Sequence, residues 1–418
     1  MEVAYHGGKA AREQLSRVLL VCPEPLGHRQ PAGVGIRFIE MARVLSSDGH
    51  SVTVLSPDAG EVANCRADSI TAEHLLRHTQ QSDVAVIQGH AANDFFANGR
   101  PVPTVIDLYD PFIIENLHYY ASRGAEVFAH DHATLIGSML RGDFFLCASE
   151  TQRLFYLGLM LAVGRLNPMA FENDPRLESL IAVAPFGVQP KQPSTAPRAQ
   201  AILFGSIYDW YDPILAIDAV ALARQTIPEI TLTFTTHPNP DLTPQDKTAE
   251  ATRYVERRGY GSFIRFEPWV EYDRRGEFFD RFSLALLTFR QSLETDLSMR
   301  TRIYDYLWGG LPVVTSSAPG TDELLTRYGA GSIVRSDSPR EFADAMLRVI
   351  RADLTSMRAG AARFVDEHQW PRVLQPLVEF CRQPRVDSSK EAFAVRMQTP
   401  DRPPSILSRL KRRIGGPS

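Results

Sequence analysis

The sequence predicts an α/β protein built from two Rossmann-like domains, each a doubly wound parallel sheet, which face each other across a cleft. Three observations predict this fold class. Short apolar stretches alternate with amphipathic segments along both halves of the chain. A proline-rich segment, 185–198, interrupts the alternation near the middle. The chain has 418 residues, which is more than one ordinary hydrophobic core organises.

The first half begins with a strand, a loop, a helix and a second strand, which together form a βαβ unit. The loop is Pro31–Gly35, and the predicted helix is Ile36–Leu45. Continuous apolar runs are typical of parallel strands that are buried on both faces. The strands predicted on this basis are Val18–Cys22, Ser51–Leu55, Val84–Gln88, Thr104–Asp107, Phe144–Ala148 and a short one ending near Val183.

The same alternation resumes after the proline-rich segment. The predicted strands are Ala201–Phe204, Thr231–Thr235, Phe263–Phe266, Leu284–Thr288, Pro312–Thr315 and Ser332–Val334. The predicted helices are Ile214–Arg224, Thr301–Trp308, Thr321–Arg327 and Pro339–Ile350. Strands that alternate with helices indicate a second parallel sheet.

These patterns set the expected domain boundaries. We place the N-terminal domain at residues 1–190 and the C-terminal domain at residues 199–369. Residues 370–385 are expected to cross back to the N-terminal domain, because Pro371–Cys381 repeats apolar residues at helical spacing and needs a surface to cover.

Residues 386–418 are predicted to form a polar, basic tail. The last stretch, Ser405–Ser418, carries Arg409, Lys411, Arg412 and Arg413 and no acid. Two interpretations stand side by side. The tail is either a solvated segment or a basic amphipathic segment that makes peripheral contact with an anionic membrane.

Composition excludes several classes of protein. A net charge of −4 gives no general affinity for nucleic acid. The four cysteines lie far apart without metal-ligand spacing, so neither a zinc site nor a disulfide framework is predicted. The N-terminus lacks the apolar core of a signal peptide, and no run approaches the roughly 18–20 apolar residues of a spanning helix. We therefore expect a cytoplasmic protein with reduced thiols, membrane-associated at most peripherally.

The most specific motif is DLSMRTRIYDYLWGGLPVVTS, Asp296–Ser316. Ser298 can cap a helix that begins near Arg300. Arg300 and Arg302, beside a helix N-terminus, offer a diphosphate both positive charge and N–H donors. Asp305 lies one turn further on, where its carboxylate can accept hydrogen bonds from ribose hydroxyls. The alternative is a surface helix with solvated charges.

Within this motif, RTRIYDYLWGGLPVV resembles the donor motif of the GT-B glycosyltransferases of the group-one, glycogen-synthase-like type. The opening VLLVCPEPL, with AGVGIRFIEMARVLSSDGHSVTVLSP after it, resembles the N-terminal strand, loop, helix and strand of that family. The stretches CASETQRLFYLGLM, VAPFGV, GSIYDWYDP and THPNP are similar to a bacterial branch of it.

The resemblance implies that the N-terminal domain binds an acceptor and the C-terminal domain binds most of a nucleotide sugar. It implies transfer of a sugar from a nucleoside diphosphate to an acceptor hydroxyl with retention of configuration, in glycan or glycosylated natural-product synthesis. The acceptor would be a glycan, a lipid-linked sugar or a small molecule. No metal or other cofactor is expected, because basic residues and a helix N-terminus hold the diphosphate. A sugar-nucleotide epimerase of the same fold and a catalytically silent nucleotide-sugar-binding protein are the rival interpretations.

Carried over by position, several residues would contact the donor. Asp305 would hold the ribose, while Gly33 and Gly35 would face the diphosphate across the cleft. The segment 298–302 would surround the diphosphate, and 269–270 would border the base. The remaining predicted donor residues are His237, Trp269, Val270, Glu294, Ser298, Arg300, Thr301 and Arg302.

The sequence departs from the family pattern in three places. Leu297 and Asp305 stand where relatives carry two glutamates eight residues apart, and Glu294 is among the acids nearest to the first position. Gly205–Pro213 lacks the usual arginine and lysine. Ile106–Asp107 stands where the family has a His-Asp pair, so the family's catalytic histidine has no counterpart there.

Catalytic residues are predicted at the carboxyl ends of the N-terminal strands, where α/β sheets place their ligands. Asp107 and Asp110, in DLYDP, and His90, after another strand, are the candidates for contact with the acceptor or the transferring sugar. The alternative for the aspartates is a turn-capping role. The His-Asp-His cluster at 130–132 is not predicted to bind metal, because residues two apart on a helix do not share a face.

Overall fold

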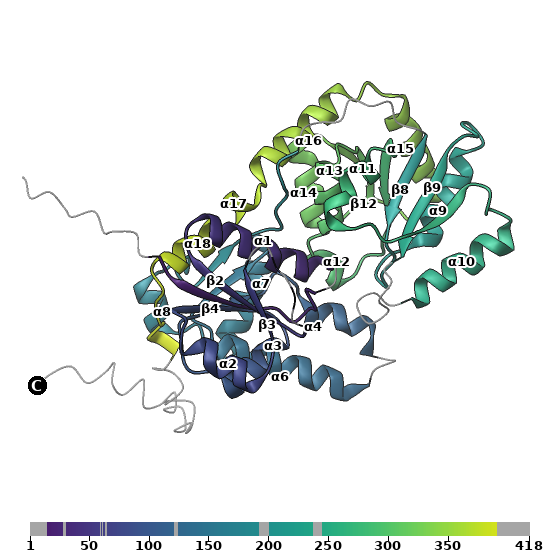
Figure 1. The fold of residues 1–418 in the computed structure, drawn as a ribbon. Coiled ribbons are helices and arrows are strands. Elements are labelled where there is room, and N and C mark those ends of the chain that lie inside the picture. The colour runs from purple at the N-terminus through teal and green to yellow at the C-terminus, as the bar shows by residue number, and fades with distance from the viewer. Residues whose placement is uncertain are drawn as a thin grey trace, which may run out of the picture.

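The computed structural model describes residues 15–27, 31–58, 60, 62, 65–120, 124–191, 200–236 and 245–390. These residues form two α/β domains, the N-terminal one coloured purple to teal and the C-terminal one mainly green (Figure 1). Each domain holds one parallel sheet with helices packed on it, so the predicted fold class is confirmed.

The N-terminal domain is a seven-stranded parallel sheet in the order β3-β2-β1-β4-β5-β6-β7. Its strands are β1 (Arg17–Val21), β2 (Ser51–Ser56), β3 (Arg66–Ser69), β4 (Val84–Ile87), β5 (Thr104–Asp107), β6 (Phe144–Cys147) and β7 (Ile181–Val183). Its helices are α1 (Gly33–Ser47), α2 (Ala72–Thr79), α3 (Ala91–Asn98), α4 (Phe112–Glu115), η1 (Asn116–His118), α6 (Ala125–Arg141), α7 (Glu150–Ala162) and α8 (Pro168–Asn173). Val18 and Leu20 join the core on the α1 face, whereas Leu19 and Val21 join the core on the α3 and α6 face.

The C-terminal domain is a six-stranded parallel sheet in the order β10-β9-β8-β11-β12-β13. Its strands are β8 (Ala201–Gly205), β9 (Thr231–Thr236), β10 (Ile264–Pro268), β11 (Leu284–Leu287), β12 (Val313–Ser316) and β13 (Gly331–Val334). Its helices are α9 (Pro213–Ala223), α10 (Asp246–Arg258), η2 (Tyr272–Arg274), α11 (Arg275–Phe279), α12 (Leu293–Leu297), α13 (Thr301–Trp308), α14 (Pro319–Tyr328), α15 (Pro339–Arg351) and α16 (Thr355–Glu367).

The structure contains several elements that the sequence pattern does not predict, among them β3 and α10. β3 pairs with β2 alone at the edge of the sheet and is partly exposed, so its polar residues need no apolar pattern. α10 buries only Ala251 and Val255, which leaves little apolar periodicity to detect. The first helix also begins at Gly33, earlier than the predicted Ile36.

Residues 370–390 lie against the N-terminal domain. Trp370 packs on Phe186 at 4.7 Å between ring centroids, and Phe380 stacks on Phe144 at 4.9 Å. The predicted single helix is divided into α17 (Trp370–Val373) and α18 (Gln375–Arg382). Pro376 explains the division, because it has no N–H to donate and its ring clashes with the carbonyl four residues earlier.

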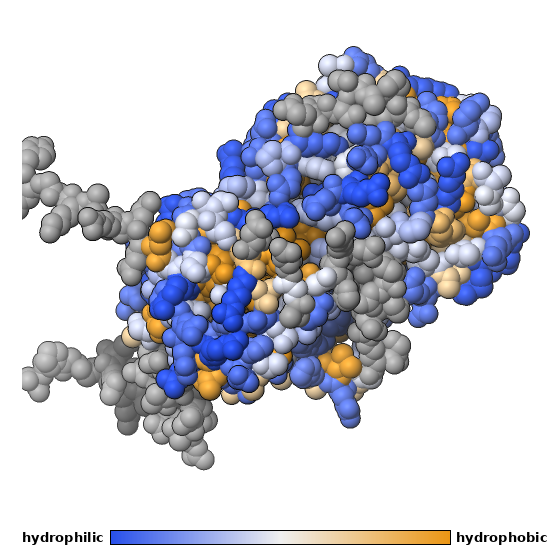
Figure 2. Space-filling model, in the orientation of Figure 1, coloured by the Kyte–Doolittle hydropathy of each residue, from blue (hydrophilic) through white to orange (hydrophobic). Residues whose placement is uncertain are grey.

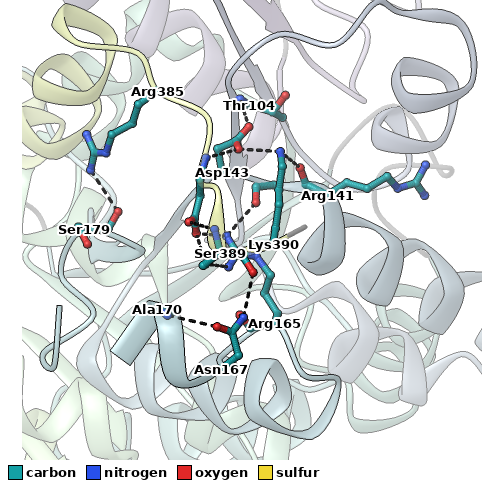
Figure 3. A network of polar contacts seen from close by, with 12 residues as sticks. Thr104, Arg141, Asp143, Arg165, Asn167, Ala170, Ser179, Arg385, Ser389 and Lys390 are labelled. Carbon is teal, nitrogen blue, oxygen red and sulfur yellow. Dashed lines mark hydrogen bonds and ion pairs between the residues drawn. The ribbon is translucent and has the colours of Figure 1, made fainter. Parts of the chain in front are cut away.

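Polar contacts fasten the end of this segment to the N-terminal domain (Figure 3). Arg165 Nη2 pairs with Asp387 Oδ2 at 2.6 Å, and Lys390 Nζ pairs with Asp143 Oδ1 at 2.6 Å. The Asp387 N–H also donates to Asp143 at 2.7 Å. The segment held on the domain therefore extends to Lys390 rather than ending at residue 385.

The molecular surface shown in Figure 2 is mainly polar. On the face shown in Figure 2, polar residues cover most of both domains and apolar residues show through in patches, one of them where the domains meet. No helix among the described residues is long and apolar enough to cross a bilayer. The basic stretch Ser405–Ser418 lies outside the described residues.

We predict that truncation on the two sides of this segment has opposite results. A chain ending at Gln369 loses buried side chains such as Leu377 and Phe380, each worth about 1.5–3 kcal/mol of burial. It should bind an apolar dye and melt well below the full chain. A chain ending at Lys390 is the matched control and should keep the full chain's Tm. Equal Tm values for all three chains would contradict this account.

Candidate active site

A pocket of about 90 Å³ lies at the carboxyl ends of β8, β9 and β10. Pro31 and Ile36, from the N-terminal domain, line its opposite side, so the pocket lies between the domains. Its aromatic lining consists of Trp269, Tyr272, Phe278, Phe279 and Tyr306, and its polar lining consists of Ser206, Thr235, Arg275, Arg302 and Asp305. The mixture of an apolar wall with a few polar groups is typical of a small-molecule site.

Asp305, on α13, and Arg275, at the start of α11, form the polar centre of the pocket. Arg275 Nε lies 3.5 Å from Asp305 Oδ1. The guanidinium carbon lies 3.7 Å from the ring centre of Tyr272 and 4.4 Å from that of Trp308. Burial raises the pKa of Asp305, and the positive charges of Arg275 and Arg302 oppose that rise. The pocket therefore holds a carboxylate and a cation that do not make a normal hydrogen bond to each other.

Arg302 lies at the edge of the pocket, beside the end of β8. Its Nη2 donates to Ser206 Oγ at 2.7 Å, and its Nη1 donates to the Ser206 carbonyl. The guanidinium also lies over the Tyr211 ring at 4.5 Å. Gly205 adopts a φ of +83° here, a conformation that side-chain-bearing residues rarely adopt. The turn thus brings the Ser206 backbone against Arg302.

Trp269 and Val270 line the pocket, as Asp305 and Arg302 do. Thr301 is the first residue of α13 and is not part of the lining. His237 lies outside the described residues. Four predicted donor residues therefore come together in one cavity.

Arg300 and Glu294, both predicted to contact the donor, are not part of the pocket lining. They form a bidentate ion pair with each other, at 2.5 and 2.7 Å, and their exposed fractions are 5% and 1%. A buried guanidinium needs a partner charge, and Glu294 on the adjacent α12 supplies it. Arg300 is therefore not available to a diphosphate in this structure.

Ser298 also differs from its predicted role. It ends α12 instead of capping α13, and its Oγ donates to Glu115 Oε1 of the N-terminal domain at 3.2 Å. Gln152 also bridges the domains, because its Nε2 donates to the carbonyls of Tyr109 and Leu297 at 3.1 and 3.0 Å. This part of the motif joins the two domains.

The amides around Gly33 and Gly35 are engaged by a side chain that the sequence did not single out. The Gly35 N–H donates to Glu24 Oε2 at 2.8 Å, and the amides of Ala32 and Val34 also bond this carboxylate. Burial raises the pKa of Glu24 to about 7, and these N–H bonds oppose the rise. Glu24 thus holds the position at the start of α1 that was predicted for the donor phosphates.

Asp107 is held in a buried ion pair and does not reach a ligand. Its carboxylate accepts from Arg37 Nε and Nη2 at 2.7 and 3.0 Å, and neither side chain is exposed. The structure therefore engages Asp107, a predicted catalytic residue, with Arg37. Asp110 instead bonds to Glu115, and burial raises the pKa of Asp110 to about 6 and that of Glu115 well above its usual range. One proton shared between the two carboxyls is consistent with both shifts.

His90 follows β4 and remains 45% exposed. Its Nε2 lies 2.9 Å from Asp131 Oδ1, and Asn116 Nδ2 donates to the other oxygen of Asp131 at 2.7 Å. The ring stacks on His130 at 4.9 Å and lies 5.4 Å from Phe112. Burial lowers the pKa of His90, so the imidazole is neutral near pH 7 and can accept a proton.

The first two residues of the cluster at 130–132 lie against His90. His130 stacks on His90, and Asp131 pairs with His90. Across the described residues, no group of three metal-ligating side chains is close enough to hold an ion.

Comparison with known proteins finds a family model that matches part of the C-terminal domain, and solved structures whose fold is similar across both domains. Residues 199–352 match the family model of the glycosyl transferases group 1. HepE of Anabaena in complex with UDP and glucose is 15% identical, with a TM-score of 0.66 over 88% of this chain and 100% of that one. Trehalose-6-phosphate synthase OtsA is 13% identical, with a TM-score of 0.63 over 89% and 100%.

Sucrose-phosphate synthase from Thermosynechococcus elongatus is 12% identical, with a TM-score of 0.59 over 91% of this chain and 99% of that one. The curated protein sequences contain no significant match. The likeness to these structures across both domains confirms the predicted GT-B fold.

The buried ion pair generates a stability prediction. Arg300→Met leaves the Glu294 carboxylate buried without its partner, which should lower the free energy of unfolding by roughly 3–5 kcal/mol. Replacing both residues, with Glu294→Leu added, removes the orphaned charge and should restore most of that loss. Denaturant titration of the three chains measures both effects. An Arg300→Met chain as stable as the original would show that the pair does not hold this region.

Proposed function

We propose that this chain, whose residues 199–352 match the family model of the glycosyl transferases group 1, moves a sugar from a nucleoside diphosphate sugar to an acceptor hydroxyl. The observation that carries the proposal is the pocket formed around Asp305, Arg302 and Trp269. It lies in the domain that matches the family, at the carboxyl ends of its strands, with cations and a carboxylate set in an aromatic wall. HepE, which shares the fold, has been solved with UDP and with UDP-glucose, which supports a nucleotide-sugar donor.

On the donor side, the departing nucleoside diphosphate gathers negative charge on its phosphate oxygens. A cation and helix N–H groups that are already in place stabilise this charge without reorganising. In this proposal Arg302, fixed by Ser206, and the first turn of α13 perform that task. The reaction then needs no metal or other cofactor.

Glu24 and the donor phosphates compete for the start of α1. Because the amides at the start of α1 already donate to Glu24, the phosphates are placed nearer to Arg302 than to Gly33 and Gly35 in this proposal. With retention of configuration, a donor phosphate oxygen accepts the proton of the acceptor hydroxyl. This route does not need the two carboxyl groups that glycosidases use, one as the acid and the other as the base or nucleophile.

On the acceptor side, His90 is the residue best placed to orient an acceptor hydroxyl. Asp131 orients its ring, and the ring is half-exposed at the carboxyl end of β4. Asp110, with its raised pKa, contributes a hydrogen bond from the interdomain junction. The acceptor is proposed to be a glycan, a lipid-linked sugar or a small molecule in the cytoplasm, with membrane contact only through the tail beyond Lys390.

The proposal is tested with purified protein and a panel of UDP-, GDP-, ADP- and dTDP-sugars. We expect at least one to raise the Tm and to donate its sugar to an acceptor, with activity unchanged in EDTA. Arg302→Ala should weaken binding of the matching nucleoside diphosphate by roughly 1.5–3 kcal/mol, the range for a hydrogen bond to a charged group.

The other outcomes separate the rivals. Isomerisation of the donor sugar would indicate an epimerase, and tight binding with no turnover would indicate a silent binding protein. Absence of binding to every nucleotide sugar would refute the proposal. Activity lost in EDTA and restored by Mg²⁺ or Mn²⁺ would refute independence from metal.

We also predict that His90→Gln lowers kcat by up to about 10²-fold, the cost of misplacing a reacting group, because His90 orients the acceptor hydroxyl. The Kd of the nucleoside diphosphate should not change, because His90 is not part of the lining of the donor pocket. His130→Gln is the matched control, since it removes the stacked ring but leaves Asp131 paired with His90. An equal fall in kcat for both variants would assign His90 a purely structural role.

A further inference from the structure

Arg275 is a buried cation whose hydrogen-bonding capacity is not used within the described residues. Its exposed fraction is 7%, and it lines the pocket. The ring faces of Tyr272 and Trp308 hold the guanidinium in place. Among the described residues, its Nε and Nη1 atoms have no hydrogen-bond partner. Such donors are normally satisfied when they are buried.

Asp305 offers an unsatisfied acceptor beside these unsatisfied donors. Its Oδ1 is also buried without a hydrogen-bond partner among the described residues, and it lies 3.5 Å from Arg275 Nε. That distance exceeds the 2.7–3.2 Å of an ordinary N–H···O bond. An oxygen atom about 2.8 Å from both atoms would complete the geometry.

The chemistry of the two partners selects a hydroxyl for this position. The bridging group must donate to a carboxylate and accept from a guanidinium at once. A hydroxyl does both, whereas an ammonium only donates and a phosphate oxygen only accepts. A phosphate would also meet the negative charge of Asp305. Arg275 is therefore not the second cation of a diphosphate site, despite its charge.

The order of residues along α13 assigns this hydroxyl to one part of the donor. Arg302 and Asp305 are three residues apart, as are Asp305 and Trp308, so each pair lies side by side on the helix surface. Arg302 marks the diphosphate end in the proposed function. Asp305 lies one turn further, with Arg275 between it and Trp308. One turn from the phosphates is where the ribose of a nucleoside diphosphate lies.

We infer that Arg275 and Asp305 together clamp one hydroxyl of the donor ribose, with Asp305 accepting its proton and Arg275 donating to its oxygen. The inference rests on the proposed function and deepens it, because it makes Arg275 a specificity-determining residue for ribonucleotide donors. No motif points to Arg275, which lies in a different helix from Asp305.

The test measures Kd by calorimetry on the full chain with UDP, GDP and ADP and with the 2′-deoxy and 3′-deoxy forms of the tightest binder. The original chain should bind one of the two deoxy forms at least tenfold more weakly than the parent nucleotide. Arg275→Met should bind the parent at least tenfold more weakly and should no longer distinguish it from that deoxy form. Arg274→Met is the matched control: Arg274 is the exposed neighbour, and its loss should change neither value.

Each result decides the matter. The clamp is overturned if Arg275→Met weakens binding of the parent nucleotide and of both deoxy forms by the same factor. It is also overturned if the original chain binds both deoxy forms as tightly as the parent nucleotide. In either case nucleotide binding itself stands. If the original chain binds no nucleoside diphosphate, the proposed function fails together with the clamp. Should Arg275→Met unfold, Arg275→Lys is tested instead, because it keeps the charge but not the planar guanidinium. It must reduce the ratio between the Kd of the deoxy form and the Kd of the parent nucleotide.

Discussion

The relative placement of the two domains depends on a short pairing between the two segments that cross from one domain to the other. The Val188 N–H donates to the His368 carbonyl at 2.8 Å, and the Trp370 N–H donates to the Val188 carbonyl at 3.3 Å. A single flexible connection would leave the domains free to turn, whereas two connections that bond to each other restrict them to a hinge. The carboxyl ends of both sheets can then border one pocket.

The same crossing segment is coupled to the pocket wall. The Gln189 carbonyl accepts from Trp308 Nε1 at 2.7 Å, and its side chain donates to Glu40 of α1 at 2.5 Å. Trp308 in turn stacks on Arg275 inside the pocket. A ligand that binds Arg275 therefore contacts a residue that stacks on Trp308, and Trp308 is bonded to the crossing segment at Gln189. Donor binding and closure of the domains are physically linked through these contacts.

Buried charge decides which polar residues remain for chemistry. Arg37 with Asp107, and Arg300 with Glu294, form pairs that are almost fully enclosed. Breaking such a pair leaves an unpaired charge in the protein interior, which is far more costly than breaking one at the surface. Three of these four residues stood out in the sequence as candidates for binding or catalysis, and the structure uses them to hold its elements together.

The sequence by itself determined the two sheets, because a parallel strand buried on both faces must be apolar along its length, as Phe144–Cys147 is. It also located Arg302 and Asp305, since helical spacing within one short motif places them on one face. Only the tertiary structure decided that Glu24 occupies the start of α1 and that Arg275 faces Asp305. Electrostatic partners are chosen by distance and burial in three dimensions, and neither quantity is present in a local pattern of residues.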